Sequence, residues 1–420
     1  MNWKLCFSLI LVGFALTTAF GQEGQDQNTC VTCHEMMGAP YESIVTAQQP
    51  DVHGENGITC VDCHGGDPTS MDPEQSMSEA AGYIGTPDPT EIPQVCADCH
   101  SDAEYMGEFD PGLPVDQLAK YQTSQHGQLL LEAGDTKVAE CVSCHGAHGI
   151  MPVDDPRAEV YPLNVPNTCN ECHGDVEYMA EYNIPTDQFQ EYKNSVHGMA
   201  VLDNQDLGAP ACNDCHGNHG ATPPGVTSIS QVCGTCHANN MRLFQGSVHE
   251  PVFDMMGLPE CETCHGNHDV EPPTDEMIGV GDRSVCLNCH MEGDPGYTMA
   301  AQMGHAIDTL RTSYDSAQVA IQQAANRSMN VEDLQFNLRS VRQELIQSRT
   351  MIHSFDTTRV NEHKRAGLST SRDIIRQADA LVDEYYFRMT GFGIFTLIIT
   401  LIAILFYLKI RQIERRQPRE

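Results

Sequence analysis

The sequence predicts a mainly helical protein with little β structure. Short helices and irregular loops should be followed by a long helical hairpin and one membrane-spanning helix at the C-terminus. Three observations support this prediction: nine Cys-x-x-Cys units recur between residues 30 and 290, apolar runs are scarce outside the two ends, and Gly and Pro nearly vanish after Ala300. A middle region this long and this polar is not expected to fold around one ordinary hydrophobic core.

The charge balance limits the possible partners. The 420 residues include 58 acidic and 23 basic side chains, which give a formal charge of −35. A nucleic-acid-binding protein needs clustered Lys and Arg to neutralise phosphates, so this composition argues against nucleic acid. The acidity suits a domain outside the cytoplasm that meets basic partners or none.

The two ends of the chain predict secretion and membrane anchoring. Residues 1–21 contain one Lys, a short apolar run and then small residues, which is typical of a cleaved secretory signal; an N-terminal anchor would need a longer run. Residues 389–408 are uncharged and long enough to cross a bilayer core of about 30 Å. We expect a transmembrane helix at 386–409 and, by the positive-inside rule, a basic cytoplasmic tail at 410–420. This predicts a single-pass protein of the bacterial cytoplasmic membrane with its bulk in the periplasm.

Every Cys-x-x-Cys unit is followed directly by His. Cys-x-x-C-H is the attachment signature of haem c, in which two thiols form thioethers with the haem and the adjacent imidazole binds the iron. The predicted thioether cysteines are Cys30, Cys33, Cys60, Cys63, Cys96, Cys99, Cys141, Cys144, Cys169, Cys172, Cys212, Cys215, Cys233, Cys236, Cys261, Cys264, Cys286 and Cys289. The predicted proximal iron ligands are His34, His64, His100, His145, His173, His216, His237, His265 and His290.

Three other interpretations of the cysteines are weaker. A disulfide framework, zinc sites and thioredoxin-like redox motifs all use cysteine pairs, but none requires His after every second Cys. The sequence therefore predicts nine covalently bound haem c groups within a cytochrome domain at residues 22–296. With a haem for every few dozen residues, the porphyrins should form much of the core, and the chain without haem should be largely unfolded.

The haem region is internally repeated. Residues 96–127 align with 169–198, and each copy then runs to a Cys-x-x-Cys-His-Gly-x-His unit. A shortened copy starts at Cys233, an N-terminal copy at Cys30 and a half-copy at Cys286. Repeated units that cannot bury their own faces usually stack, so we expect a roughly linear array of haem pairs.

Ten histidines remain for the distal positions on nine irons. A surface position is the simple alternative for any one of them, but eight recur at repeated or near-repeated places. The predicted distal ligands are His53, His126, His148, His197, His219, His249, His268, His305 and His353. His363 is the alternative to His353 as the ninth ligand. Met106 and Met179 are further candidates, although packing is the preferred role for both. A vacant sixth position on one haem is the remaining option.

The doubled histidines predict cross-linking between haems. His148 follows His145 by three residues and cannot reach the far face of the same iron, because the macrocycle lies between. We therefore expect His148, His219 and His268 each to serve a haem other than their own. At the first repeat Asp67 replaces this histidine, so the N-terminal pair must find its ligand elsewhere.

The C-terminal third predicts long helices. Apolar residues at alternating three- and four-residue spacing predict two antiparallel helices within residues 297–385, separated by a break at 328–330. A third helix should run from about Ser371 into the membrane. The hairpin could be a bare stalk, or it could present His353 to a haem.

The array of CxxCH motifs with S-x-H-G and C-H-G-x-H linkers resembles the multihaem cytochrome c superfamily, particularly the cytochrome c3-like and doubled CxxCH families. The resemblance implies bis-histidine, low-potential haems in stacked pairs, and a role as a periplasmic electron conduit beside quinol-oxidising membrane subunits. The helical end is similar in architecture to pentahaem nitrite reductases and octahaem hydroxylamine oxidoreductases. The CxxCK catalytic motif of the nitrite reductases is absent, because all nine motifs here end in His, and no substrate tyrosine of the hydroxylamine oxidoreductases can be placed.

These patterns favour an electron-transfer protein, with no catalytic residue assigned. It would relay electrons between a quinol-oxidising membrane subunit and periplasmic or outer-membrane cytochromes. The transmembrane segment contains no His and cannot bind a haem b through histidine, so quinol oxidation needs another subunit. The alternative is an oxidoreductase of nitrite, hydroxylamine or sulfur oxyanions with one open-coordination haem. A haem filament is disfavoured, because a membrane anchor hinders free polymerisation.

Overall fold

The protein is all-helical wherever its structure is described. The computed structural model describes residues 28–222 and 229–416, so the predicted signal peptide lies outside it. These residues form helices and no strand, as the sequence predicted. They divide into two compact units, the first made of residues 28–184 with 210–222 and the second of residues 185–209 with 229–416.

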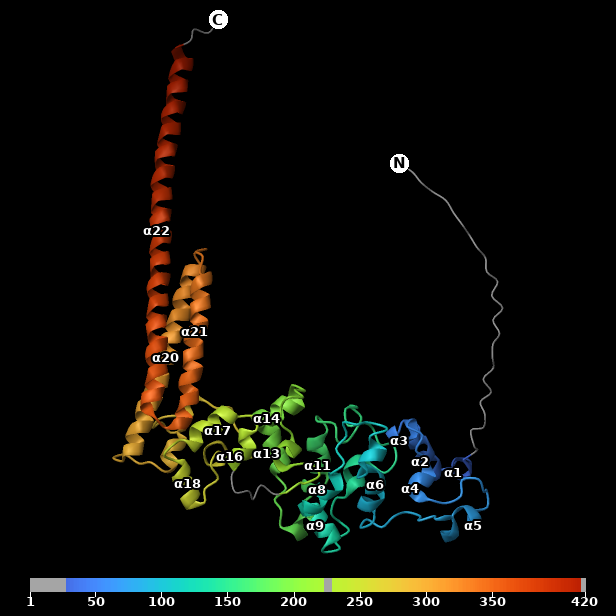
Figure 1. Cartoon of the computed structure of the whole chain (residues 1–420). Coiled ribbons are helices and arrows are strands. Elements are labelled where there is room, and N and C mark those ends of the chain that lie inside the picture. Colours follow the sequence, from blue (N-terminus) through green and yellow to red (C-terminus); the bar gives the residue numbers. More distant parts are fainter. Residues whose placement is uncertain (1–27, 223–228, 417–420) are drawn as a thin grey trace, which may run out of the picture. The chain divides into compact units, whose positions relative to one another are not determined.

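The first unit consists of short helices joined by loops (Figure 1). Its helices are α1 Thr29–Met37, α2 Tyr41–Gln48, α3 Val52–Glu55, α4 Cys60–His64, α5 Pro73–Ser76, η1 Glu79–Ala81, α6 Ile92–His100, α7 Ala103–Met106, α8 Gln117–Thr123, α9 Gln125–Leu131, α10 Cys141–His145, α11 Val165–His173, α12 Val176–Met179, η2 Ala180–Tyr182 and α15 Cys212–His216. Five of its six CxxCH motifs end one of these helices, and the first lies within α1, which continues past His34 to Met37.

A helical motif places its two cysteines on one face. Residues three apart are neighbours on a helix surface, so both thiols of a Cys-x-x-Cys turn can meet one flat cofactor. Helices α10 and α15 then end at Gly146 and Gly217, which have φ of 78° and 80°. Only glycine adopts this conformation without steric cost, which explains the Gly after the motif histidine.

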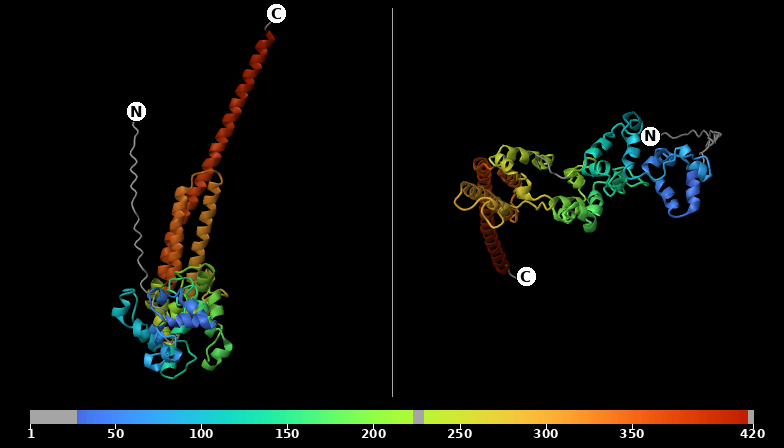
Figure 2. Two further views of the ribbon diagram at one scale, coloured as in Figure 1. Left: turned by 90° about the vertical axis from the view of Figure 1, so that its right-hand side faces the viewer. Right: turned by 90° about the horizontal axis from the view of Figure 1, so that it is seen from below.

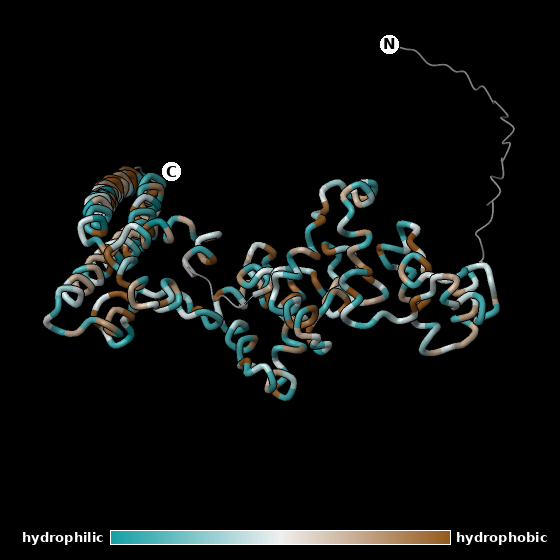
Figure 3. Tube along the Cα trace, turned by 60° about the horizontal axis from the view of Figure 1, so that its bottom comes forward, coloured by the Kyte–Doolittle hydropathy of each residue, from teal (hydrophilic) through white to brown (hydrophobic). Residues whose placement is uncertain are grey.

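The first unit has little apolar core of its own. Its buried apolar side chains, such as Leu130 and Val165, are scattered singly along the chain. Figure 3 shows apolar stretches that are short and interrupted by polar ones throughout the motif-bearing loops. Met106 and Met179 are buried at equivalent places in α7 and α12, where packing accounts for them.

The second unit combines three further motifs with long helices. Its elements are α13 Gln188–Asn194, α14 Val196–Gly198, the π-helix η3 Met199–Asp203, α16 Ile229–Gly234, α17 Ala238–Gln245, α18 Glu250–Met256, α19 Glu262–His265, η4 Asp275–Met277, η5 Val285–Asn288, α20 Pro295–Ala325, α21 Glu332–Met351, η6 Ile352–Ser354 and α22 Thr357–Arg416. Figures 1 and 2 show α20 and α21 packed side by side along the first part of α22.

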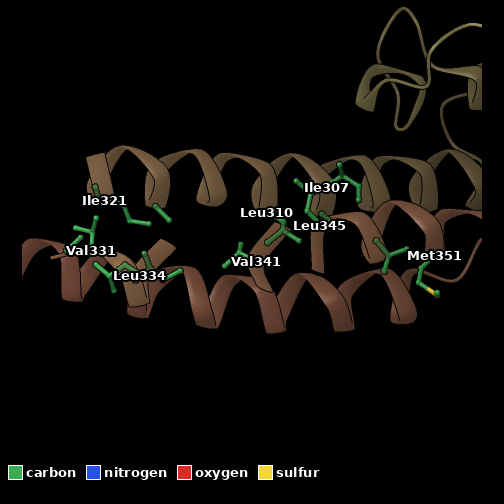
Figure 4. Close-up of a cluster of buried hydrophobic side chains, with 14 of the residues drawn as sticks. Ile307, Leu310, Ile321, Val331, Leu334, Val341, Leu345 and Met351 are labelled. Atoms are coloured by element: carbon green, nitrogen blue, oxygen red, sulfur yellow. The ribbon is translucent and has the colours of Figure 1, made fainter. Parts of the chain in front are cut away.

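These three helices enclose the main hydrophobic core of the described chain. It includes Ile307, Leu310, Val341 and Leu345, and Leu243 of α17 joins it from the motif region (Figure 4). The sequence predicted a hairpin with a third helix from about Ser371. Instead α22 begins at Thr357, because Val360, Ile374 and Ala378 continue an apolar stripe that packs on the hairpin.

Helix α22 continues beyond this bundle as an exposed apolar rod. It is the one described helix that is long and apolar enough to cross a membrane. At the turn between α20 and α21, Arg327 donates a hydrogen bond to the Tyr386 hydroxyl at 3.3 Å and lies over its ring. The bundle therefore ends where the predicted membrane segment, 386–409, begins.

Candidate haem-binding sites

Seven motif histidines each face a second histidine from elsewhere in the chain. In the first unit the ring centres are 5.9 Å apart for His100 and His53, 6.0 Å for His64 and His148, 6.1 Å for His173 and His126, and 6.2 Å for His145 and His219. In the second unit they are 6.4 Å apart for His237 and His197, 6.0 Å for His290 and His249, and 6.1 Å for His265 and His353. All seven distances fall within half an ångström of one another.

That distance is the one that a shared iron requires. A histidine nitrogen lies about 2 Å from the metal that it binds. Ring bonds of about 1.3 Å place that nitrogen roughly 1 Å from the centre of its own ring. Two imidazoles on opposite sides of one iron therefore have ring centres about 6 Å apart. The residues thus fit seven bis-histidine haem sites.

A capped helix start positions three of the facing histidines, and a serine two residues earlier holds the backbone of the fourth. His53, His126, His197 and His249 each stand two residues after Asp51, Ser124, Ser195 or Ser247. Asp51, Ser124 and Ser195 are helix N-caps, and each side chain accepts a hydrogen bond from a backbone N–H of the first turn. Ser247 likewise accepts from the backbone N–H of His249 at 3.1 Å. Such caps fix the first turn and so the direction of the imidazole.

Two glycines let this turn pack closely on the helix before it. A Cβ at Gly127 would lie 1.9 Å from the Tyr121 carbonyl oxygen, and one at Gly198 would lie 1.8 Å from that of Tyr192. No larger residue fits there without moving the backbone. The S-x-H-G string of the repeats is thus a compact unit whose serine, histidine and glycine have separate roles.

The doublet histidines His148 and His219 face motifs other than their own. His148 stacks opposite His64 with an interplanar angle of 18°, and His219 stacks opposite His145 at 8°. His353 plays the same part for His265 at 19°, and it comes from η6, in the loop that joins α21 to α22. Figure 1 shows that this loop lies at the end of the helical bundle next to α17.

The pairs follow a directional rule along the repeats. The capped histidines at 53, 126, 197 and 249 each face the first motif of the next repeat. The doublet histidines at 148 and 219 each face the second motif of the preceding repeat. Each of these ligand histidines therefore faces a motif of a neighbouring repeat. It connects its own repeat to that neighbour.

Hydrogen bonds at Nδ1 leave Nε2 as the metal-binding atom in several rings. The Nδ1 atom of His64 lies 2.8 Å from the Gly85 carbonyl oxygen, and that of His353 lies 3.0 Å from the Thr350 carbonyl oxygen. Carboxylates take this place beside His53 (Asp51, 3.1 Å) and His290 (Asp294, 3.3 Å). Partners of this kind orient metal-binding histidines and set their tautomer.

Burial favours the neutral, metal-binding form of these side chains. Desolvation is the main cause that lowers the pKa of ten of the imidazoles, and a facing histidine adds to it in most of them. They are His100, His126, His145, His148, His173, His197, His219, His249, His265 and His353. Neutral imidazole is the form that binds metal, so the folded chain presents its histidines ready for iron.

Two family models match the chain. Residues 52–174 match cytochrome c3, and residues 205–242 match the doubled CXXCH motif. No match was found among curated proteins or among solved structures. The cytochrome c3 segment contains three of the facing pairs, those of His53 with His100, His64 with His148 and His126 with His173. These two matches place the matched segments in the multihaem cytochrome c superfamily. Covalently bound haem c and a role in electron transfer follow from that membership.

Successive motifs of this multihaem cytochrome lie next to one another in chain order. In the first unit the thiols of Cys96 and Cys141 are within hydrogen-bonding reach, as are those of Cys169 and Cys212. The remaining neighbours interact electrostatically without a hydrogen bond: Cys30 with Cys60, Cys63 with Cys96, and Cys144 with Cys169. The second unit continues in the same way, with Cys233 beside Cys261 and Cys264 beside Cys286.

Three candidate distal ligands of this cytochrome have polar contacts of their own. His305 is exposed on α20, with its Nε2 atom 3.5 Å from the Thr309 hydroxyl. His363 has its Nδ1 atom 2.8 Å from the Glu344 carboxylate. His268 has the Glu191 carboxylate at 3.8 Å. His305 and His268, like the motif ligand His216, stay sequence-based predictions.

His34 differs from the seven paired motif histidines. Among the described residues, the aromatic ring against it is that of Tyr41, at 5.3 Å and 53°. That distance is too short for an iron held in line between the two rings through the Tyr41 hydroxyl. No second histidine ring lies at the bis-histidine distance from His34 within residues 28–222 and 229–416.

The residues that cap and orient the ligands were not singled out from the sequence. Asp51, Ser124, Ser195 and Ser247 are visible as a recurring D/S-x-H string, which could have predicted a capped helix start. Asp294 and the carbonyl of Gly85 carry no comparable signal, because each reaches its histidine only through the fold.

Proposed function

We propose that this protein is a single-pass electron carrier of the bacterial cytoplasmic membrane. It holds nine haem c groups on the nine CxxCH motifs, and its haem region lies in the periplasm with the C-terminus in the cytoplasm. It passes electrons between a quinol-linked membrane partner and periplasmic or outer-membrane acceptors. Each haem supplies one-electron redox chemistry when bound.

The observation that carries this proposal is the set of seven histidine pairs at a common distance of about 6 Å. A pair of this kind uses both axial positions of an iron and leaves no position for a substrate. Such a site suits electron transfer. The chain order of neighbouring motifs supports a continuous series within each unit.

The helical bundle sets the distance between the haem region and the membrane. His353 stands at one end of the bundle, and the contact of Arg327 with Tyr386 lies at the other. Residues 357–385 of α22 connect these ends, and 29 residues of helix at about 1.5 Å each span roughly 44 Å. A redox cofactor within the bilayer is too remote to exchange electrons with His353 directly. The membrane partner therefore has a domain that projects beside the bundle.

The cofactor number and the topology can be tested on the mature protein. Intact mass spectrometry should show nine covalent haems and the loss of residues 1–21. In spheroplasts, an added protease should remove the haem region, while an epitope within residues 410–420 stays protected. Fewer than nine haems, or a protected haem region, would contradict the corresponding part of the proposal.

Interrupting the series tests whether electrons follow the chain order. The double variant Cys141→Ala/Cys144→Ala removes the fourth of the nine attachment sites. A fast photoreductant first reduces accessible haems at random, and electrons then redistribute toward the haems of highest potential. In the natural protein this redistribution should not depend on protein concentration. In the variant, part of it should become slow and proportional to concentration, because electrons must then pass between molecules.

The matched control removes a terminal site. Cys30→Ala/Cys33→Ala deletes the first motif and leaves the rest of the series continuous, so redistribution should stay independent of concentration. If the Cys141→Ala/Cys144→Ala protein also redistributes electrons independently of concentration, chain order is not the order of transfer.

A further inference from the structure

The directional rule leaves one motif without a donor. Capped histidines face the first motif of the next repeat, from His53 to His100 and from His126 to His173. The motif at Cys30, Cys33 and His34 is the first motif of the first repeat. Residues 1–29 contain no histidine, so this sequence offers no capped histidine before it.

The histidine count agrees with this gap. All 19 histidines of the chain lie within the described residues. In the first unit eight of them form the four pairs given above, and the two others, His34 and His216, both belong to CxxCH motifs. The first unit therefore holds no spare histidine for the iron at His34.

The doublet position of the first repeat carries a carboxylate instead. Asp67 stands where the other repeats have His148 or His219, and its Oδ1 atom accepts hydrogen bonds from the Thr69 N–H and hydroxyl. These bonds lower the pKa of Asp67, so it is ionised at neutral pH. Its charge acts on Cys30, which places a negative charge beside the first motif.

The surroundings of this motif are uniformly acidic. Residues 28–119 contain 17 Asp and Glu and no Lys or Arg. Anions are therefore repelled from this end of the first unit, and the field favours cations and neutral molecules. An open iron here is poorly suited to nitrite or sulfur oxyanions.

We propose that the haem attached at Cys30 and Cys33 has His34 as its one histidine ligand and binds small uncharged molecules at its other axial position. The presence of a haem at this motif rests on the proposed function. The inference adds that the first haem of the electron-transfer series binds ligands. Tyr41, with its ring 5.3 Å from that of His34, packs beside the proximal imidazole.

The test uses the full-length membrane protein with carbon monoxide and imidazole as uncharged probes. The oxidised protein should show a high-spin ferric signal in EPR that imidazole converts to low-spin. The reduced protein should bind carbon monoxide, and Cys30→Ala/Cys33→Ala should abolish this binding with the loss of one haem by mass. His148→Gly is the positive control, because opening the site at His64 should add one bound carbon monoxide per chain.

Two further measurements test the class of molecule that binds and whether His305 is a distal ligand. Nitrite should leave the high-spin signal unchanged at concentrations at which imidazole converts it, and tighter binding of nitrite would overturn the uncharged class. His305→Ala should leave the spectrum unchanged; if it creates a second high-spin haem, His305 is a distal ligand and the count of donors is wrong. The absence of a high-spin signal, or a charge-transfer band of methionine-bound iron, overturns the proposal. Neither result affects the electron redistribution that tests the proposed function.

Discussion

Asp51 occupies a position that the other repeats give to serine. Its carboxylate is buried and caps α3. One oxygen lies 3.1 Å from Nδ1 of His53, and the other accepts hydrogen bonds from the backbone N–H groups of Gly149 and Ile150. Gly149 follows His148 directly. One carboxylate therefore supports His53, which faces His100, and also the loop whose His148 faces His64.

Replacing this carboxylate should raise one reduction potential. A carboxylate that accepts a proton-sharing hydrogen bond from an imidazole adds negative charge to the ligand and stabilises ferric over ferrous iron. In Asp51→Asn we expect the potential of the haem at His100 to rise by on the order of tens of millivolts. Spectroelectrochemical titration of the full chain would measure this change.

Asp72→Asn is the matched control for this change. Asp72 caps α5 from an exposed position and contacts no histidine, so its replacement should leave all potentials unaltered. If the titration of Asp51→Asn superimposes on that of the natural protein, the Asp51 charge does not reach the iron.

At the scale of single residues, the sequence predicted the candidate ligands but not the groups that orient them. The CxxCH motifs predict their own roles, because the chemistry needs those three side chains at that spacing. The role of Asp51 depends on Gly149 and Ile150, about a hundred residues away, and the orientation of His64 depends on the carbonyl of Gly85. Contacts of this kind arise from the fold and leave no local pattern.

The elements that carry the ligands divide the sites into two geometrical classes. Ligands from the doublets and from η6 give nearly parallel ring pairs, with interplanar angles of 18°, 8° and 19°. Ligands from the capped helices give steeper pairs, at 86°, 57°, 41° and 89°. The repeats that start at Cys96 and Cys169 each supply one ligand of each kind, His126 with His148 and His197 with His219.

These classes should be distinguishable by EPR. Two iron d orbitals interact with the axial imidazole rings. Parallel rings raise the energy of one orbital above that of the other, which gives a rhombic low-spin signal. Perpendicular rings affect the two orbitals equally and give a highly anisotropic low-spin signal. We expect both signals in the oxidised protein. His148→Gly should remove intensity from the rhombic signal, and His53→Gly should remove it from the anisotropic signal. Loss from the same signal in both variants would show that the ring angles are not retained around iron.

Substitution of His353, in η6, can be compared directly with substitution of His363, in α22. Substituting His353 by Gly should turn one low-spin haem high-spin, because His353 faces His265 at 6.1 Å. Added imidazole should restore the low-spin signal. His363→Gly should leave the spectrum unchanged, since its ring is held by Glu344. A spectrum of His353→Gly identical to that of the natural protein would remove His353 as a ligand.

The helical end shows which elements the sequence predicts well. The spacing of apolar residues predicted α20 and α21, and the uncharged run predicted the end of α22. The start of α22 was placed too late, because polar residues within 357–374 surround an apolar stripe of Val360, Leu368 and Ile374 that packs on the bundle. Only the packing of this stripe on α20 and α21 reveals it.

Across the whole molecule, haem and apolar side chains stabilise different parts. The main hydrophobic cluster draws on α20, α21 and α22, whereas the motif regions bury few apolar side chains. In cells that cannot attach haem c, we expect the chain to keep these three helices and to lose structure over residues 28–290. Hydrogen exchange by mass spectrometry should show protection within residues 300–380 of the haem-free chain and throughout the haem-loaded chain. Uniform loss of protection would show that the bundle also depends on haem, through His353.

The charge of the whole molecule predicts the kind of acceptor that it meets. The chain has a formal charge of −35, and its first 92 described residues contain no Lys or Arg. Opposite charges accelerate encounter, and salt screens them over a Debye length of about 10 Å at 0.1 M. Electron transfer to a small basic cytochrome should therefore be fast at low ionic strength and should slow steeply as salt is added. Transfer to an acidic acceptor of similar potential should be slow and should accelerate with salt, because screening then relieves repulsion.

Stopped-flow measurements with the two acceptors compare these trends directly. Rates that do not vary with salt for either acceptor would mean that the acidic surface is remote from the site where electrons leave, and that the acceptor binds elsewhere on the chain.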